Sequence, residues 1–161
     1  MTVNDYNYCV DQHSDSVYRF ILKNIRDKEK ARDLVQDSFE KLWINVRQVE
    51  AEKAKSYLFT TAYHKMIDQT RADKRSATWE EVNVNRLGHS EQYTDMMEKL
   101  NEGINRLPAD QRSVILLRDY EGYSYREISG ITGLSESQVK VYIYRARVFL
   151  KEYIGSIEAL V

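Results

Sequence analysis

The chain has 161 residues, of which 30% are charged and 42% are apolar, a balance typical of a globular protein rather than a disordered one. No apolar run approaches about 18 residues and no basic segment leads into an apolar one, so we expect neither a membrane span nor a secretory signal and place the protein in the cytoplasm. Cys9 is the only cysteine, which excludes an internal disulfide and a cysteine-built metal site.

The net charge of −1 is unevenly distributed along the chain. Residues 51–79 carry six basic residues (lysine or arginine) and three acidic ones. Residues 80–111 carry three basic and seven acidic residues, and residues 138–151 carry four basic residues and no acidic one. Two basic stretches therefore flank an acidic middle. Because neutralisation of phosphates dominates the affinity for nucleic acid, we expect the chain to bind DNA weakly by itself.

The first part of the chain is predicted to form three helices around one core. Apolar residues over 10–25 indicate the first helix, whose start the pattern does not define. Asp27 is a good N-cap for the second helix, in which apolar residues recur at helical spacing over 31–46. The third helix is predicted over 54–75.

Downstream, the periodicity lapses over 76–93. Further helices are predicted over 97–107, ended by Pro108, and over 109–120, ended by Gly122. The single proline, the six glycines and the lack of alternating apolar runs indicate helices throughout. We therefore predict an all-α fold with two small helical domains, residues 1–76 and 94–161, joined by a flexible linker over 77–93.

Two capping boxes follow in quick succession. Ser124 and Glu127 open a short helix, which Gly133 is well placed to end as a left-handed cap. Ser135 and Gln138 open the next helix. Two helices joined by such a short turn have the layout of a helix-turn-helix.

The second of these helices is predicted to be amphipathic, with a buried stripe at Val139, Ile143, Ala146 and Leu150. The opposite side carries small polar and basic residues, which suit insertion into the DNA major groove. The candidate DNA-binding residues are Ser137, Lys140, Val141, Tyr144, Arg145, Arg147 and Lys151. A competing interpretation makes the basic side chains merely solvated, but the capped helix and glycine turn before them favour DNA contact.

These motifs resemble region four of an extracytoplasmic-function sigma factor of the sigma-70 family. The matching stretches are LPADQR (107–112), YEGYSYREI (120–128) and VKVYIYRAR (139–147). The first half is similar to region two of the same family through ARDLVQDSF (31–39), Leu42 with Trp43, and YLF (57–59), with Ala62, Asp68 and Arg71 downstream. The two motif sets cover most of the chain and leave mainly the linker unmatched.

The resemblance implies that the region-two helix docks on a coiled coil of the polymerase β′ subunit. The residues carried over for this contact are Asp33, Gln36, Asp37, Phe39 and Trp43. The helical spacing of Phe39 and Trp43 instead favours burial in the core for these two. A solvated face remains the alternative for the three polar residues, which lie beside the apolar stripe.

The resemblance also assigns the minus-ten promoter element to the loop over 47–52 and to the helix after it. The loop would cradle an extruded base, and the helix would stack on unpaired bases and hold phosphates. The candidates are Gln48, Val49, Glu50, Tyr57, Thr60, Thr61, His64, Lys65, Arg71 and Arg75. Phe59 is expected in the core, and Tyr57 is open between core and DNA. His64 in this helix departs from the residue that the family often has at its position. Ser129, Val141 and Tyr142 depart in the same way within the helix-turn-helix.

The resemblance implies an alternative sigma factor that binds core RNA polymerase, through the β′ coiled coil and the β flap, and promoter DNA. An anti-sigma factor is a further expected partner. The runner-up is a stand-alone helix-turn-helix regulator, which would need a basic surface or a symmetric dimer, and the net charge argues against the first. A third possibility is a helical adaptor in which the basic helix is incidental.

An enzyme is not expected. The histidines at positions 13, 64 and 89 are scattered, and no cluster has metal-ligand spacing. No glycine-rich loop suited to phosphate occurs either. We therefore predict no catalytic residue, no metal and no cofactor.

Overall fold

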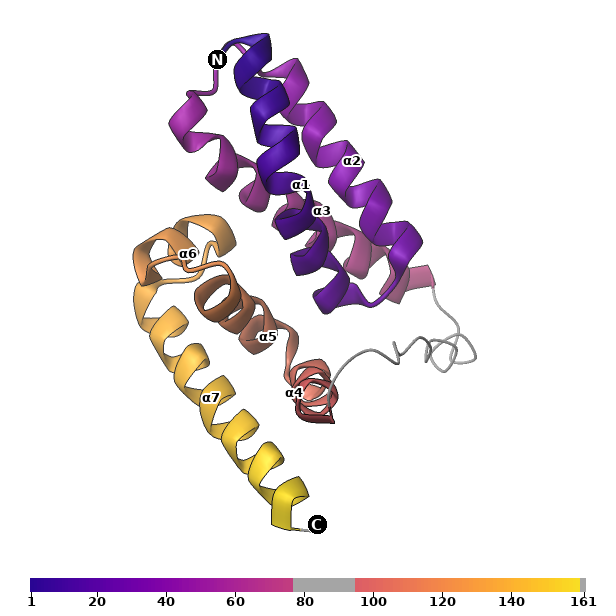
Figure 1. Cartoon of the computed structure of the whole chain (residues 1–161), viewed down its shortest axis with the longest axis vertical. Helices are drawn as coiled ribbons and strands as arrows, with labels where there is room; N and C mark the ends of the chain where they lie inside the picture. The colour runs from indigo at the N-terminus through magenta and orange to yellow at the C-terminus, as the bar shows by residue number, and fades with distance from the viewer. Residues whose placement is uncertain (77–94, 160–161) are drawn as a thin grey trace. The chain divides into compact units, whose positions relative to one another are not determined.

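The computed structural model describes residues 1–76 and 95–159, so the linker predicted over 77–93 lies outside the described residues. All the regular secondary structure in these two stretches is helical, which confirms the predicted all-α class (Figure 1). The chain divides into two compact units, one built chiefly from α1 to α3 and the other from α4 to α7. None of the described helices is long and apolar enough to cross a membrane.

The first unit is a three-helix assembly in which every helix contacts the other two. Its helices are α1 (Val3–Ile25), α2 (Lys28–Ile44) and α3 (Ala54–Ser76), with a short 3-10 turn, η1 (Ala51–Lys53), before α3. The rings of Phe20 and Phe59 meet in the core with centroids 5.6 Å apart, so Phe59 is buried as predicted. Other core side chains are Val17, Ile21, Ala31, Leu34, Leu42, Leu58, Ala62 and Met66.

The starts of α1 and α2 follow from local capping. Asp27 caps α2 as predicted, because its Oδ1 accepts a hydrogen bond from the Lys30 backbone N–H at 3.1 Å. α1, whose start the apolar pattern left undefined, begins at Val3. Thr2 and Asp5 form a reciprocal capping box there, with bonds of 2.9 and 3.1 Å. The two orphan N–H groups thus satisfied explain this start.

The second unit places one long helix, α7 (Glu136–Ala159), against α4 (Asp95–Arg106) and α5 (Ala109–Ile115). α5 continues into a π-helical segment, η3 (Leu116–Tyr120), and α6 (Tyr125–Thr132) precedes α7. A Cβ on Gly103 of α4 would lie 2.9 Å from Leu150 Cδ2 and 3.0 Å from Tyr153 Cδ1 of α7. The close approach of α4 to α7 therefore uses the missing side chain of this glycine.

The helix-turn-helix is confirmed in its local detail. Ser124 and Glu127 cap α6 reciprocally, with bonds of 2.9 and 3.1 Å. Gly133 follows α6 at φ +82°, in the left-handed conformation expected of its cap. Ser135 and Gln138 then cap α7, with bonds of 3.0 and 3.1 Å.

Candidate functional site

The buried and exposed faces of α7 separate as the sequence pattern predicted. Val139, Ile143 and Ala146 are at most 1% exposed, and Leu150 is partly buried. The other side holds all the candidate DNA-binding residues of this helix in exposed positions, namely Ser137, Lys140, Val141, Tyr144, Arg145, Arg147 and Lys151. Because the buried stripe ties the helix to its unit, the direction of the exposed face is fixed.

Two cationic side chains, Arg118 and Lys140, lie near the aromatic ring of Tyr125 on α6, beside the exposed face of α7. The guanidinium carbon of Arg118 lies 4.6 Å from the ring centroid of Tyr125, and Lys140 Nζ lies 5.7 Å from it. Arg118 also donates to the Tyr123 carbonyl at 2.9 Å. Cations within about 6 Å of a ring face are attracted to it. Arg118, which lies against the neutral Tyr125 ring, therefore extends the cationic surface beyond α7. Periodicity within one helix could not have revealed either residue.

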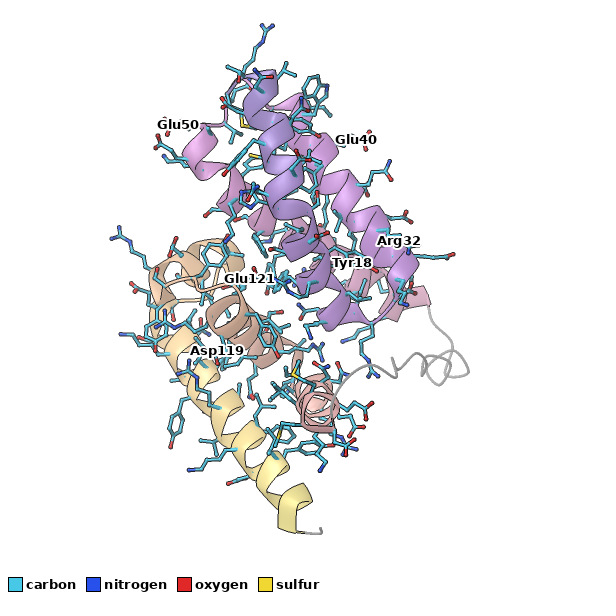
Figure 2. The ribbon with its side chains drawn as sticks, viewed as in Figure 1. Tyr18, Arg32, Glu40, Glu50, Asp119 and Glu121 are labelled. Carbon is cyan, nitrogen blue, oxygen red and sulfur yellow. The ribbon has the colours of Figure 1, made fainter. Side chains whose placement is uncertain are left out.

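Arg147 is joined to a carboxylate of the π-helical segment. Its Nη2 and Nε donate to the two carboxylate oxygens of Asp119, at 2.6 and 3.3 Å. Hydrogen bonding to Asp119 raises the pKa of Arg147, with smaller contributions from Tyr125. The pair spans 28 residues of sequence, so the spacing within α7 did not indicate it. Asp119 lies on the ribbon that follows α5 (Figure 2).

The exposed side of α2 contains most of the residues predicted to dock on the polymerase. Asp33, Gln36 and Asp37 are exposed, and Phe39 is buried, as its spacing favoured. The expectation that Trp43 belongs to the core is wrong, because 46% of it is exposed. Trp43 lies in the last turn of α2, where the ring of Tyr6 covers only one side of it, with centroids 5.0 Å apart.

A shallow depression adjoins this side of α2. Figure 2 labels Tyr18 of α1 and Arg32 of α2, two of the residues around it. The full lining is Ser14, Asp15, Tyr18, Arg32, Val35 and Gln36. Gln36 therefore belongs both to the exposed face of α2 and to the edge of the depression.

The loop after α2 is held by backbone hydrogen bonds. The amino nitrogen of Met1 donates to the carbonyls of Val46 and Val49, at 2.8 and 3.1 Å. Gln48 and Glu50 are exposed, but Val49 is only 9% exposed. The side chain of Val49 was predicted to help cradle a base, and its burial against the unit removes it from the exposed surface.

The candidates on α3 divide in the same way. Thr61 is 7% exposed, because it lies on the core side of α3, and its side chain is likewise removed from the candidate surface. Tyr57, left open by the sequence, is half-buried, and its hydroxyl accepts a hydrogen bond from Asn45 Nδ2 at 3.2 Å. The other candidates are partly or fully exposed, namely Thr60, His64, Lys65, Arg71 and Arg75.

One stripe of α3 collects most of these exposed side chains. Helical geometry of 3.6 residues per turn puts positions 57, 60, 64, 71 and 75 on one side, together with the exposed Asp68. The stripe combines an aromatic, a hydroxyl, an imidazole and two guanidinium groups with the carboxylate of Asp68. Within the described ranges, no three histidine, cysteine, aspartate or glutamate side chains are grouped so that they could hold a metal ion.

Comparison with known proteins finds two family matches, one in each half of the chain. The family described as Sigma-70 region 2 matches residues 9–76, and the family described as Sigma-70, region 4 matches residues 93–150. The extracytoplasmic-function RNA polymerase sigma factor SigM of Bacillus subtilis is 29% identical over 144 residues, which are 86% of this chain and 88% of SigM. SigV of the same organism is 29% identical over 141 residues, 86% of this chain and 84% of SigV.

A solved structure is similar over almost the whole chain. The sigma factor RpoE of Bartonella quintana, solved in complex with the anti-sigma factor NepR, has a TM-score of 0.82 and 27% identity. The match covers 95% of this chain and 98% of RpoE. The chain therefore belongs to the sigma-70 family and is an extracytoplasmic-function sigma factor, an alternative sigma factor that binds core RNA polymerase and directs promoter recognition.

Proposed function

We propose that three exposed surfaces divide the work of this sigma factor: α2 docks on core polymerase, α3 and its preceding loop hold the minus-ten element, and α7 reads the minus-thirty-five element. The observation that carries the proposal is the clean separation of α7 into a buried stripe and a polar, basic face. A helix fixed in this way can present side chains to base edges and phosphates in the major groove.

The docking face of α2 is a continuous exposed stripe. Positions 33, 36, 37 and 40 are acidic or amide residues, and Trp43 and Ile44 continue the same side of the helix, 46% and 74% exposed. Aromatic anchors next to charged groups are characteristic of protein interfaces. The stripe therefore suits a partner helix that offers both basic and apolar side chains, such as the β′ coiled coil.

The stripe on α3 suits unpaired DNA. Tyr57 can stack on a base, and Arg71 and Arg75 can pair with phosphates. Gln48 and Glu50, exposed in the loop before α3, offer polar groups to the edge of an extruded base. The partly exposed Lys65 adds a positive charge beside the stripe.

The remaining assignments concern organisation and partners. We propose that residues 1–76 and 94–161 act as the two domains and residues 77–93 as the linker. We further propose an anti-sigma partner, since the similar RpoE was solved with one. The protein would act in the cytoplasm alongside its polymerase, by binding and without catalysis of its own. A pull-down from cells with the tagged full chain, scored for one stoichiometric partner besides polymerase, tests the anti-sigma proposal.

Reconstitution with core RNA polymerase and a library of promoter DNA tests the main proposal. The chain with polymerase should select fragments that share two spaced elements and should start transcription downstream of them. The chain without polymerase should select little. Tight, specific binding without polymerase would instead establish the stand-alone regulator. A complex with polymerase that starts at no selected promoter would contradict the division of work.

A further inference from the structure

The π-helical segment η3 lies next to the helix-turn-helix. Two neighbouring side chains of this segment, Arg118 and Asp119, contact residues of the helix-turn-helix. The wider winding is seen in the hydrogen bond from the Glu121 N–H to the Leu116 carbonyl, at 3.2 Å across five residues. Arg118 of this segment faces the Tyr125 ring, and Asp119 holds Arg147 of α7.

The Asp119 carboxylate accepts two hydrogen bonds from one edge of the Arg147 guanidinium. The two hydrogen bonds use Nε and Nη2, so Nη1 takes no part in them. The Arg147 side chain nonetheless stays 50% exposed. A planar guanidinium held along one edge has its orientation fixed, and it can still donate from its other nitrogen to a second pair of acceptors.

We propose that Asp119 is a positioning residue for upstream promoter binding: it orients the guanidinium of Arg147 so that the part turned away from the carboxylate meets a DNA phosphate. The proposal rests on the proposed function of α7. It gives Asp119, an acidic residue in a basic surface, a role that the charge of the surface alone does not predict. Arg147 lies about three turns into α7, beyond the first turns from which base edges are usually read.

Two physical effects of removing the Asp119 carboxylate have opposite signs. A negative charge near DNA repels phosphates, so simple electrostatics predicts that Asp119→Asn tightens binding. If Asp119 orients Arg147, the same change frees a flexible side chain that must be ordered again on binding, and binding weakens. Whether Asp119→Asn tightens or weakens DNA binding therefore shows which of the two effects dominates.

The test measures binding of the full chain, assembled with core RNA polymerase, to promoter DNA with the preferred or an altered upstream element. Asp119→Asn should weaken binding to both DNAs, by on the order of threefold to tenfold. Arg147→Lys, which keeps the charge but loses the fork, should weaken binding to a similar extent. Asp119→Glu should recover part of the loss. In the double variant, the two losses should not add, because each removes the same oriented contact.

Matched controls distinguish positioning from charge and from folding. Glu152→Gln removes the same charge from an exposed position on α7 and should leave binding unchanged or slightly tighter. Thermal unfolding of Asp119→Asn should change little, since exposed ion pairs contribute little to stability. Equal or tighter binding by a folded Asp119→Asn variant would overturn the proposal, as would fully additive losses with Arg147→Lys.

A further variant separates this inference from the function on which it rests. Lys140→Ala should reduce discrimination between the two DNAs. If Lys140→Ala, Arg147→Lys and Asp119→Asn are all without effect, α7 does not read the upstream element and the proposed function fails. If only Asp119→Asn is without effect, the proposed function stands and the positioning role is wrong. A loss confined to the preferred element would overturn the assignment to phosphate.

Discussion

Tyr6 of α1 and Trp43 of α2 pack edge to face, with ring centroids 5.0 Å apart and an interplanar angle of 63°. The Tyr6 hydroxyl donates to the Phe39 carbonyl at 3.1 Å, which fixes the ring against α2. Trp43 is therefore held in place on one side and open to solvent on the other. A rigid, half-exposed aromatic of this kind is well suited to anchor a partner.

Trp43→Ala should weaken binding to core polymerase by more than about tenfold, because a central aromatic contact commonly contributes about 2 kcal/mol or more. The melting temperature should fall only modestly, since nearly half of the side chain is already exposed. A pull-down titration and thermal unfolding measure the two effects. Tyr8→Ala removes an exposed aromatic from α1 and serves as the control. Equal binding by wild type and Trp43→Ala would show that Trp43 lies outside the interface.

Asp33→Ala combined with Gln36→Ala should also weaken polymerase binding while leaving the fold intact. Both side chains are exposed, so their removal opens no cavity. Asp11→Ala with Gln12→Ala takes the same acid and amide from an exposed site on α1 and should bind normally. Undiminished binding by the α2 double variant, in the same titration, would refute the docking face.

The helix ends were predictable because capping is local. Asp27, Ser124 and Ser135 each bond a backbone N–H three residues on, and such spacing is visible in a single sequence. The same rule was available at Thr2 and Asp5, but the apolar pattern beside them is weak. α7 also continues to Ala159, past the last residue of the predicted stripe.

The features that were not predicted depend on contacts between helices. The exposure of Trp43 depends on where the core ends along α2, which spacing alone does not define. Arg147 was assigned to DNA as a basic residue of α7, whereas its carboxylate partner comes from the π-helical segment. The winding of that segment has no periodic signature, since its five residues are too few to define a period.

Gly133→Ala should destabilise the protein by roughly 1 kcal/mol, because φ at this position is +82° and an L side chain is strained there. Gly130→Ala is the matched control, since Gly130 lies inside α6 and an added Cβ would meet nothing within 4 Å. In that position alanine should be neutral or stabilising. Chemical denaturation of both variants measures the difference, and equal stability would rule out strain at Gly133.

Asp73 should contribute a small, pH-dependent stabilisation. Hydrogen bonds from Lys30 Nζ at 2.8 Å and Gln69 Nε2 at 3.0 Å lower the pKa of its carboxyl below 3.8. Because the folded pKa lies below the unfolded one, the contribution is complete above about pH 4 and is lost as the pH falls through the folded value. The site is exposed, so the effect should stay below about 1 kcal/mol.

The measurement is urea unfolding of wild type and Asp73→Asn between neutral and acid pH. The wild type should be the more stable at pH 7, and the difference should close in acid. Lys30→Met removes the strongest donor and should abolish most of the same difference. A difference that persists unchanged into acid would show that the carboxylate charge is not its source.

Lys140 and Lys151 should affect promoter binding in different ways. Both are exposed on α7, but Lys140 lies in the second turn, from which base edges are reached, and its Nζ is held 5.7 Å from the Tyr125 ring centroid. Lys151 lies four turns into the helix, where phosphate contact is expected. Lys140→Ala should therefore cost about 1–3 kcal/mol on the preferred element and flatten discrimination there.

Lys151→Ala should instead weaken binding to every DNA sequence to a similar extent. It should also reduce the salt dependence of binding by about one counterion, as a lost phosphate contact does. Both variants are measured as holoenzyme over a salt series, on DNA with the preferred and with a scrambled upstream element. Two separate quantities result, the ratio between the DNAs and the slope against salt. Lys140→Ala should change mainly the ratio and Lys151→Ala mainly the slope. If Lys140→Ala leaves the ratio unchanged, Lys140 makes no base contact and belongs with the solvated lysines of an ordinary amphipathic helix.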